Sequence, residues 1–143
     1  MRPRSWQLRQ ILLLLDEAAA AQPLADEVVA ACGEPPEVPL RLVRAGGRLQ
    51  ILFYRLRLRL DDLDLGQDLD EVRDQARGLL LYHQWMLREA LSAACSPSGI
   101  ARLRINGLGA PANRLRELRD EICSLVDAQA ARHRCEPPVA PMF

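Results

Sequence analysis

Apolar residues recur at alternating steps of three and four between positions 68 and 95. The recurring positions are Leu69, Val72, Ala76, Leu79, His83, Met86, Ala90 and Ala93. This spacing places them on one face of an α-helix, because steps of three and four bracket the 3.6-residue turn. Asp68 and Glu71 have the spacing of a capping box, and Pro97 and Gly99 follow the last apolar position. The pattern therefore predicts a long amphipathic helix over residues 68–95.

Helical spacing also occurs near both ends of the chain. Residues 5–21 are predicted to form a helix that Ser5 can cap. Pro23 stands where a second helix, residues 24–32, would begin, and Gly33 provides its stop. These two segments form either a helical hairpin or one kinked helix. After a short candidate strand at residues 101–105, Pro111 opens a final helix that runs to about Arg132.

Residues 38–60 combine two patterns that favour different structures. Gly46-Gly47 separates two apolar runs, and a tight turn between strands needs the positive φ angles that glycine permits. From Arg55 to Leu60 the chain then alternates strictly between arginine and leucine, as a two-faced strand does. We therefore predict a β-hairpin here, although the leucines between Leu49 and Leu63 also fit helical spacing.

The alternation has the wrong phase for a regular hairpin. If Ile51 and Phe53 face the core, an uninterrupted pleat turns the three arginines inward and the three leucines outward. A β-bulge near Tyr54, a second layer over the leucines, or a helix in place of the strand would each remove this conflict.

Together these elements predict an α+β fold in one helix-rich domain over residues 1–135, followed by a flexible proline-rich tail at 136–143. In chain order the elements are two N-terminal helices, a β-hairpin, the long amphipathic helix, a short strand and a C-terminal helix. An all-α bundle is the alternative if residues 49–65 are helical. At 143 residues the chain is long enough for a single core.

The charged residues narrow the class of partner. All 19 basic residues are arginine, and 19 acidic residues balance them to a formal net charge of zero. Domains that bind nucleic acid without sequence preference usually have a basic surface, so nucleic acid is a possible but disfavoured partner. No stretch approaches the roughly 20 apolar residues of a membrane span, and the apolar run Ile11–Leu15 is too short for a secretory signal. We expect a cytoplasmic protein without a membrane partner.

The candidate catalytic and metal-binding patterns are weak. Gly107, Gly109 and Ala112 match a variant dinucleotide fingerprint, but the strand with an acidic end that should follow is missing. His133 and Cys135 are too loosely spaced from Cys123 for structural zinc, and the acidic run between positions 61 and 74 lacks the spacing of a calcium loop. We expect no catalytic residue, no metal and no cofactor.

A histidine and two large aromatic residues lie in the middle of the long helix. A histidine on an apolar helix face is usually a hydrogen-bonded core residue or a polar position that faces a partner helix. The leucines of the Arg-Leu repeat likewise have no predicted cover. We therefore expect a non-enzymatic protein–protein interaction module, such as an adaptor, assembly factor or small regulator, that self-associates. The partner-binding residues predicted on this basis are Tyr82, His83, Trp85, Met86, Leu56, Leu58 and Leu60.

Arg55, Arg57 and Arg59 support the alternative of a nucleic-acid or other polyanion binder. On one strand face their guanidinium groups would be spaced about 7 Å apart and could meet phosphates. They could equally pair with the acidic residues that follow them, or act as edge-strand charges that prevent aggregation.

Overall fold

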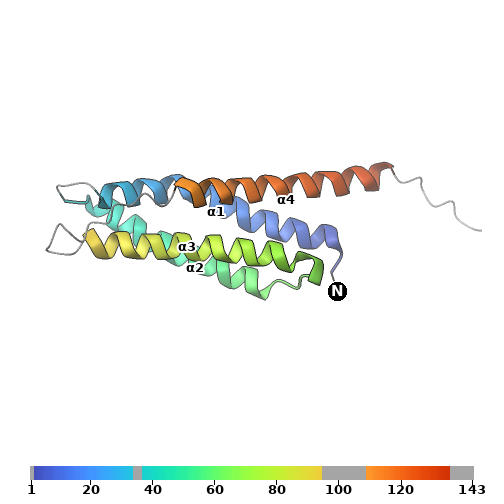
Figure 1. Ribbon diagram of the computed structural model, residues 1–143, viewed down its shortest axis with the longest axis horizontal. Coiled ribbons are helices and arrows are strands. Elements are labelled where there is room, and N and C mark those ends of the chain that lie inside the picture. Colours follow the sequence, from blue (N-terminus) through green and yellow to red (C-terminus); the bar gives the residue numbers. More distant parts are fainter. Residues whose placement is uncertain (1, 34–36, 95–108, 136–143) are drawn as a thin grey trace, which may run out of the picture.

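Four α-helices and one short 3-10 helix form the computed structural model of the protein, which describes residues 2–33, 37–94 and 109–135 (Figure 1). The elements are α1 (Arg4–Cys32), α2 (Leu40–Asp62), the 3-10 helix η1 (Gln67–Leu69), α3 (Asp70–Ala94) and α4 (Gly109–Cys135). No strand occurs within these ranges. The predicted α+β fold is therefore wrong, and the protein is an all-helical bundle.

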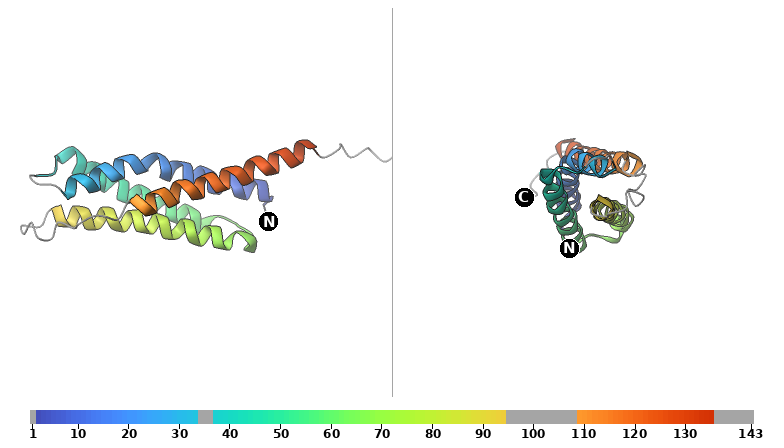
Figure 2. Two further views of the ribbon diagram at one scale, coloured as in Figure 1. Left: turned by 45° about the horizontal axis from the view of Figure 1, so that its top comes forward. Right: turned by 90° about the vertical axis from the view of Figure 1, so that its left-hand side faces the viewer.

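Successive helices run in opposite directions and enclose one core (Figures 1 and 2). α1 and α3 each contact the other three helices, whereas the described residues of α2 and α4 make no contact with each other. α4 begins part-way along the bundle and continues past the start of α1. Among the described helices, α2 therefore packs against α1 and α3 alone.

The Arg-Leu repeat belongs to α2 and is not a strand. Leu56 and Leu60 are fully buried, whereas Leu58 is 41% exposed. This division follows from helical geometry, because residues four apart share a helix face and residues two apart do not. Arginine and leucine are both strong helix formers. A helix therefore removes the phase conflict of the predicted hairpin without a bulge or a second layer.

Gly46 and Gly47 lie inside α2, so the predicted turn between two strands is also wrong. A Cβ atom on Gly46 would lie 2.8 Å from Leu91 Cδ1 and 3.0 Å from Val28 Cγ1, whereas a Cβ on Gly47 would meet nothing within 4 Å. Gly46 thus allows α2 to approach both α1 and α3 closely. Helix packing, and not turn geometry, explains the first glycine of the pair.

The other helices agree with the sequence patterns. The predicted helix over 68–95 is present as η1 and α3, and Asp68 of η1 forms an ion pair with Arg4. The two N-terminal segments form the single helix α1 with Pro23 inside it. The predicted final helix is present as α4. The candidate strand at 101–105 and the tail at 136–143 lie outside the described residues.

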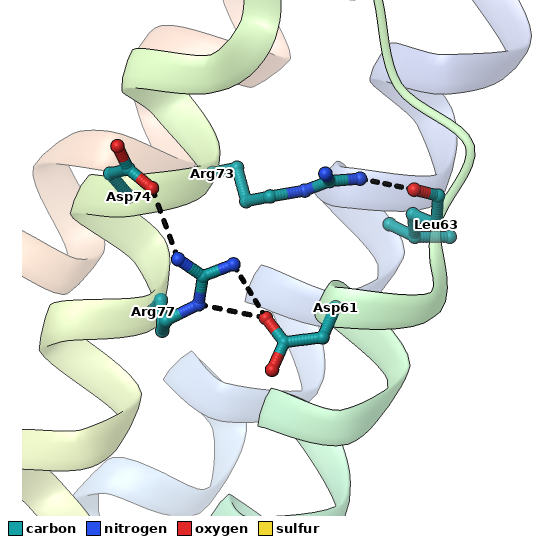
Figure 3. Close-up of polar contacts among 5 residues, drawn as sticks. All are labelled: Asp61, Leu63, Arg73, Asp74 and Arg77. Carbon is teal, nitrogen blue, oxygen red and sulfur yellow. Dashed lines mark hydrogen bonds and ion pairs between the residues drawn. The ribbon is translucent and has the colours of Figure 1, made fainter.

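Polar contacts hold the link between α2 and α3. Arg77 pairs with Asp61 at 2.7 Å and with Asp74 at 3.1 Å, and Arg73 donates a hydrogen bond to the Leu63 carbonyl (Figure 3). These contacts join the end of α2 to the first two turns of α3. Within the described ranges no helix is both long enough and apolar enough to cross a membrane.

The amino-terminal end of α1 is tied to the same link. The buried Gln7 accepts a hydrogen bond from the Gly66 N–H at 2.7 Å, and its own amide donates to the Arg2 carbonyl at 2.6 Å. Both polar ends of this buried side chain are therefore paired.

Candidate functional site

Exposed apolar side chains gather on α2 and α3. Nine large apolar residues are exposed in the described part of the chain, and six of them belong to these two helices. The six are Leu40, Ile51, Tyr54 and Leu58 on α2, and Leu81 and Trp85 on α3. Trp85 is 53% exposed. Because isolated exposed apolar residues are normal but clusters often mark interaction sites, the distribution points to this side of the bundle.

Five of these residues lie at one height along the bundle. The ring contact between Phe53 of α2 and His83 of α3 sets that height. A helix rises about 1.5 Å per residue, so residues 51–58 and 81–85 lie within about 8 Å of it along the axis. We call these five residues, together with Arg57 and Arg88, the α2–α3 patch; it comprises Ile51, Tyr54, Arg57, Leu58, Leu81, Trp85 and Arg88.

A small depression lies where Arg57 of the α2–α3 patch borders α3. It has a volume of about 230 Å³ and is lined by Arg57 of α2 and by Leu81, Gln84, Trp85 and Arg88 of α3. The Arg57 guanidinium lies 5.3 Å from the centre of the Tyr54 ring, a cation–π distance. The depression therefore combines an apolar wall with two positively charged groups.

The α2–α3 patch has an excess of positive charge. Every charged residue from Leu40 to Leu60 is an arginine. Among the described residues, no ion pair involves Arg57 or Arg88. Arg77, which also lies on α3, differs because it pairs with two aspartates. Arg57 and Arg88 are thus available to an acidic group from outside the chain.

His83 lies in the core and not in the patch. Its side chain is 0% exposed, and its Nδ1 lies 2.7 Å from the Leu79 carbonyl oxygen. Burial lowers the pKa of His83 below the ordinary value of 6.5, although the hydrogen bond to Leu79 and the charge of Asp26 act in the opposite direction. The ring is therefore neutral at pH 7, with its proton on Nδ1, and no substrate can reach it.

No protein-family model matches the chain, and neither curated proteins nor solved structures gave a significant match. Any function must therefore be inferred from the surface and the interior of the bundle itself.

The predicted partner-binding residues divide between the surface and the core. Leu56, Leu60 and His83 are fully buried and Met86 is 5% exposed, so these four pack inside their own chain. Tyr82 is half-buried with its ring against His83. The remaining two, Leu58 of α2 and Trp85 of α3, are exposed and belong to the α2–α3 patch. The sequence patterns did not predict Tyr54, Leu81 and Arg88, which lie off the apolar faces of their helices. Leu81 and Arg88 share a depression with Arg57, whose guanidinium lies over the Tyr54 ring.

Arg55, Arg57 and Arg59 do not share a face. Residues two apart on a helix point about 200° away from each other. Arg59 forms an ion pair with Glu17 of α1, whereas Arg57 borders α3. The predicted strand face of three arginines is therefore absent.

A second depression lies between the start of α1 and the carboxyl-terminal half of α4. Its volume is about 240 Å³, and it is lined by Arg4, Leu8, Leu125, Ala128, Gln129 and Arg132. It contains no aromatic side chain, and its Arg4 is already paired with Asp68. This depression is a weaker candidate for partner binding.

Metal ligands do not converge in the described part of the chain, where no group of three or more His, Cys, Asp or Glu side chains is placed to hold an ion. Cys123, one of the three residues considered for zinc, is exposed on α4. The side chains of His133 and Cys135 lie outside the described residues.

Proposed function

We propose that the protein is a non-enzymatic interaction module whose α2–α3 patch binds an acidic amphipathic segment of a partner protein. The observation that carries this proposal is the exposed Trp85 beside Arg57 and Arg88, two arginines without an acidic partner in the described chain. Tryptophan, tyrosine and arginine are the residues most enriched at the energetic centres of protein interfaces.

The size and charge of the depression indicate the chemistry of the partner. Pockets for small molecules usually measure about 300–1,000 Å³, so the depression of about 230 Å³ suits one anchoring side chain better than a whole ligand. The two guanidinium groups at its rim favour carboxylates, which they can bind through two hydrogen bonds each. A helix with apolar residues on one side and Asp or Glu beside them supplies both features.

Charge also argues against a symmetric dimer through this patch. A two-fold interface would bring four arginines, Arg57 and Arg88 of each copy, into one contact area without an acidic residue of the patch, and such an excess of like charge is unfavourable. An acidic partner therefore fits the patch better than a second copy does.

The proposal is tested by selecting binders from a displayed library of helical peptides. Selected sequences should be rich in Asp and Glu beside Leu, Phe or Trp at helical spacing. Trp85→Ala should weaken a selected peptide by about 10- to 100-fold, since residues at the centre of an interface contribute at least about 2 kcal/mol. Arg57→Glu with Arg88→Glu should abolish binding.

Leu13→Ala is the matched control, because Leu13 is 55% exposed on α1 and lies outside the patch. It should leave peptide binding unchanged. Selection of basic peptides, or equal effects of Leu13→Ala and Trp85→Ala, would contradict the proposal. A dimer in light scattering that Trp85→Ala dissociates would assign the patch to self-association instead.

A polyanion binder is a second candidate, because another arginine cluster is present on α2. Arg44, Arg48 and Arg55 are exposed and lie within about 40° of one another around the helix. None of them takes part in an ion pair with a described residue. If they bind nucleic acid, changing all three to Gln should abolish oligonucleotide binding, and wild-type affinity should fall steeply between about 50 and 200 mM salt.

A further inference from the structure

Three polar side chains on α1 and α3 carry buried atoms that have no hydrogen-bond partner. Gln22 is 0% exposed, and neither its Nε2 nor its Oε1 has a partner. Asp26 Oδ1 and His83 Nε2 are also buried and unpaired. Buried polar groups are nearly always hydrogen-bonded, and an ordered water is a frequent partner when no protein group is in reach. These atoms therefore point to an occupant.

Gln22 and His83 lie at nearly the same height in the bundle. Gly46 approaches both Val28 of α1 and Leu91 of α3, so these two residues are level. Counting six residues back along each helix from these two gives Gln22 on α1 and position 85 on α3, only two residues from His83. Two residues correspond to about 3 Å along the axis.

The ion pair between Arg4 and Asp68 independently supports this alignment. Those residues are 64 apart in the chain and Val28 and Leu91 are 63 apart, as expected for two parallel helices in one register. Asp26 lies one turn beyond Gln22, and its charge raises the pKa of His83. Gln22 is thus nearly level with His83, and Asp26 lies within electrostatic reach of the His83 ring.

Pro23 leaves a backbone carbonyl in this region without its usual hydrogen-bond donor. Proline has no N–H, so it cannot donate to the Ala19 carbonyl, its usual partner in an α-helix. Ala19, Gln22 and Asp26 are spaced by three and four residues and therefore lie along one side of α1. Breaks of this kind are places where water enters a helix.

We propose that Gln22, Asp26 and His83 form a buried hydration site between α1 and α3. In this site one ordered water accepts a hydrogen bond from Gln22 Nε2–H and donates to His83 Nε2 and Asp26 Oδ1. His83 must accept at Nε2, because its Nδ1–H is used by the Leu79 carbonyl. Three hydrogen bonds are typical of a buried water. The site is independent of the α2–α3 patch.

The water gives the bundle a specific alignment of α1 on α3. The surrounding core is mostly Leu and Ala, which tolerate sliding of one helix past another. A slip of one helical turn, about 5.4 Å, would separate Gln22 from His83 and leave both without the bridging water. A single polar position can select one register of a helix pair in this way.

Water–protein cross-relaxation in the NMR spectrum of the wild-type protein tests the site directly. The Gln22 side-chain amide protons should show a cross-peak to a long-lived water. The His83 ¹⁵N shifts should identify a neutral ring protonated at Nδ1. Gln7 is the internal control, because it is also buried but both its amide and its oxygen are paired with protein groups. A Gln22 amide with no more water contact than Gln7 would overturn the proposal.

A double-mutant cycle in urea gives a second readout. Gln22→Leu should lower the unfolding midpoint, because it removes the donor that holds the water against His83. In a His83→Leu background the same change should lower the midpoint much less or raise it. Equal shifts in both backgrounds would show that the two side chains share no bridging water.

Discussion

The imidazole of His83 stacks on the phenyl ring of Phe53, with ring centroids 5.1 Å apart and 25° between the planes. This contact joins α3 to α2 in the middle of the bundle. With its Nδ1–H bound to the Leu79 carbonyl, the neutral ring packs like an aromatic core residue. Trp85 lies two residues further along α3 and faces solvent, so neighbouring residues of one helix serve the interior and the α2–α3 patch separately.

The burial of His83 predicts a loss of stability in mild acid. Its pKa is lowered in the folded protein, so between that pKa and 6.5 the unfolded chain binds more protons and the free energy of unfolding falls as pH falls. The slope can reach about 1.4 kcal/mol per pH unit. Urea unfolding between about pH 7.5 and pH 5 should show this decrease, and His83→Gln should remove it.

Asp26 acts in the opposite direction and must be controlled. Burial raises its pKa above the ordinary value of 3.8, while His83 and Arg116 of α4 lower it. Protonation of Asp26 therefore favours the folded state as pH falls. Measuring the His83 slope in an Asp26→Asn background isolates the imidazole. A slope in that background that survives His83→Gln would contradict the assignment.

The two adjacent glycines of α2 should respond differently to alanine. Gly47→Ala should raise the free energy of unfolding by about 1 kcal/mol, because alanine favours the helix and the added methyl group meets nothing within 4 Å. Gly46→Ala should lower it by about 1 kcal/mol or more, since its Cβ would crowd Val28 and Leu91. Thermal or urea unfolding measures both. Equal gains would show that α2 does not pack closely at Gly46.

Leu56 and Leu58 have the same sequence neighbours but opposite surroundings. Each lies between two arginines, yet Leu56 is fully buried and Leu58 is 41% exposed. Leu56→Ala should lower the free energy of unfolding by about 2–5 kcal/mol. Leu58→Ala should change it by less than about 1 kcal/mol and should weaken binding to the α2–α3 patch. Similar stability losses would indicate that both leucines face the same way.

Arg77 should contribute a salt-dependent part of the α2–α3 contact. Arg77→Gln removes the ion pairs to Asp61 and Asp74, so the melting temperature should fall at low ionic strength. The loss should shrink at about 1 M salt, where screening acts over only about 3 Å. Arg119→Gln is the control, because Arg119 pairs only with its neighbour Asp120 in the described chain. An equal loss for both variants would argue against a role for Arg77 in joining the helices.

The sequence by itself determined the helices whose local signals agree. Over 68–95 a single apolar face, acidic residues at the start and no competing period lead to one structure, and α3 is found there. The segment after Pro111 is a similar case, whereas over residues 5–32 the sequence predicted helix but left open whether Pro23 separates two helices. In the first two cases, propensity and spacing point the same way, so no contact with a distant residue is needed to choose between structures.

Only the tertiary structure decided the secondary structure of residues 40–62 and the residues that make up the candidate site. The Gly-Gly pair and the Arg-Leu alternation fit a hairpin, whereas the leucine spacing of the same segment fits a helix. The close approach of Gly46 to Val28 and Leu91 explains why a glycine lies inside the helix that forms. Which leucines face outward, and that Trp85 meets Arg57, depend on how α2 lies against α3. Periodicity marks the faces of a helix, but the burial of a face depends on neighbours that are distant in the chain and close only in the fold.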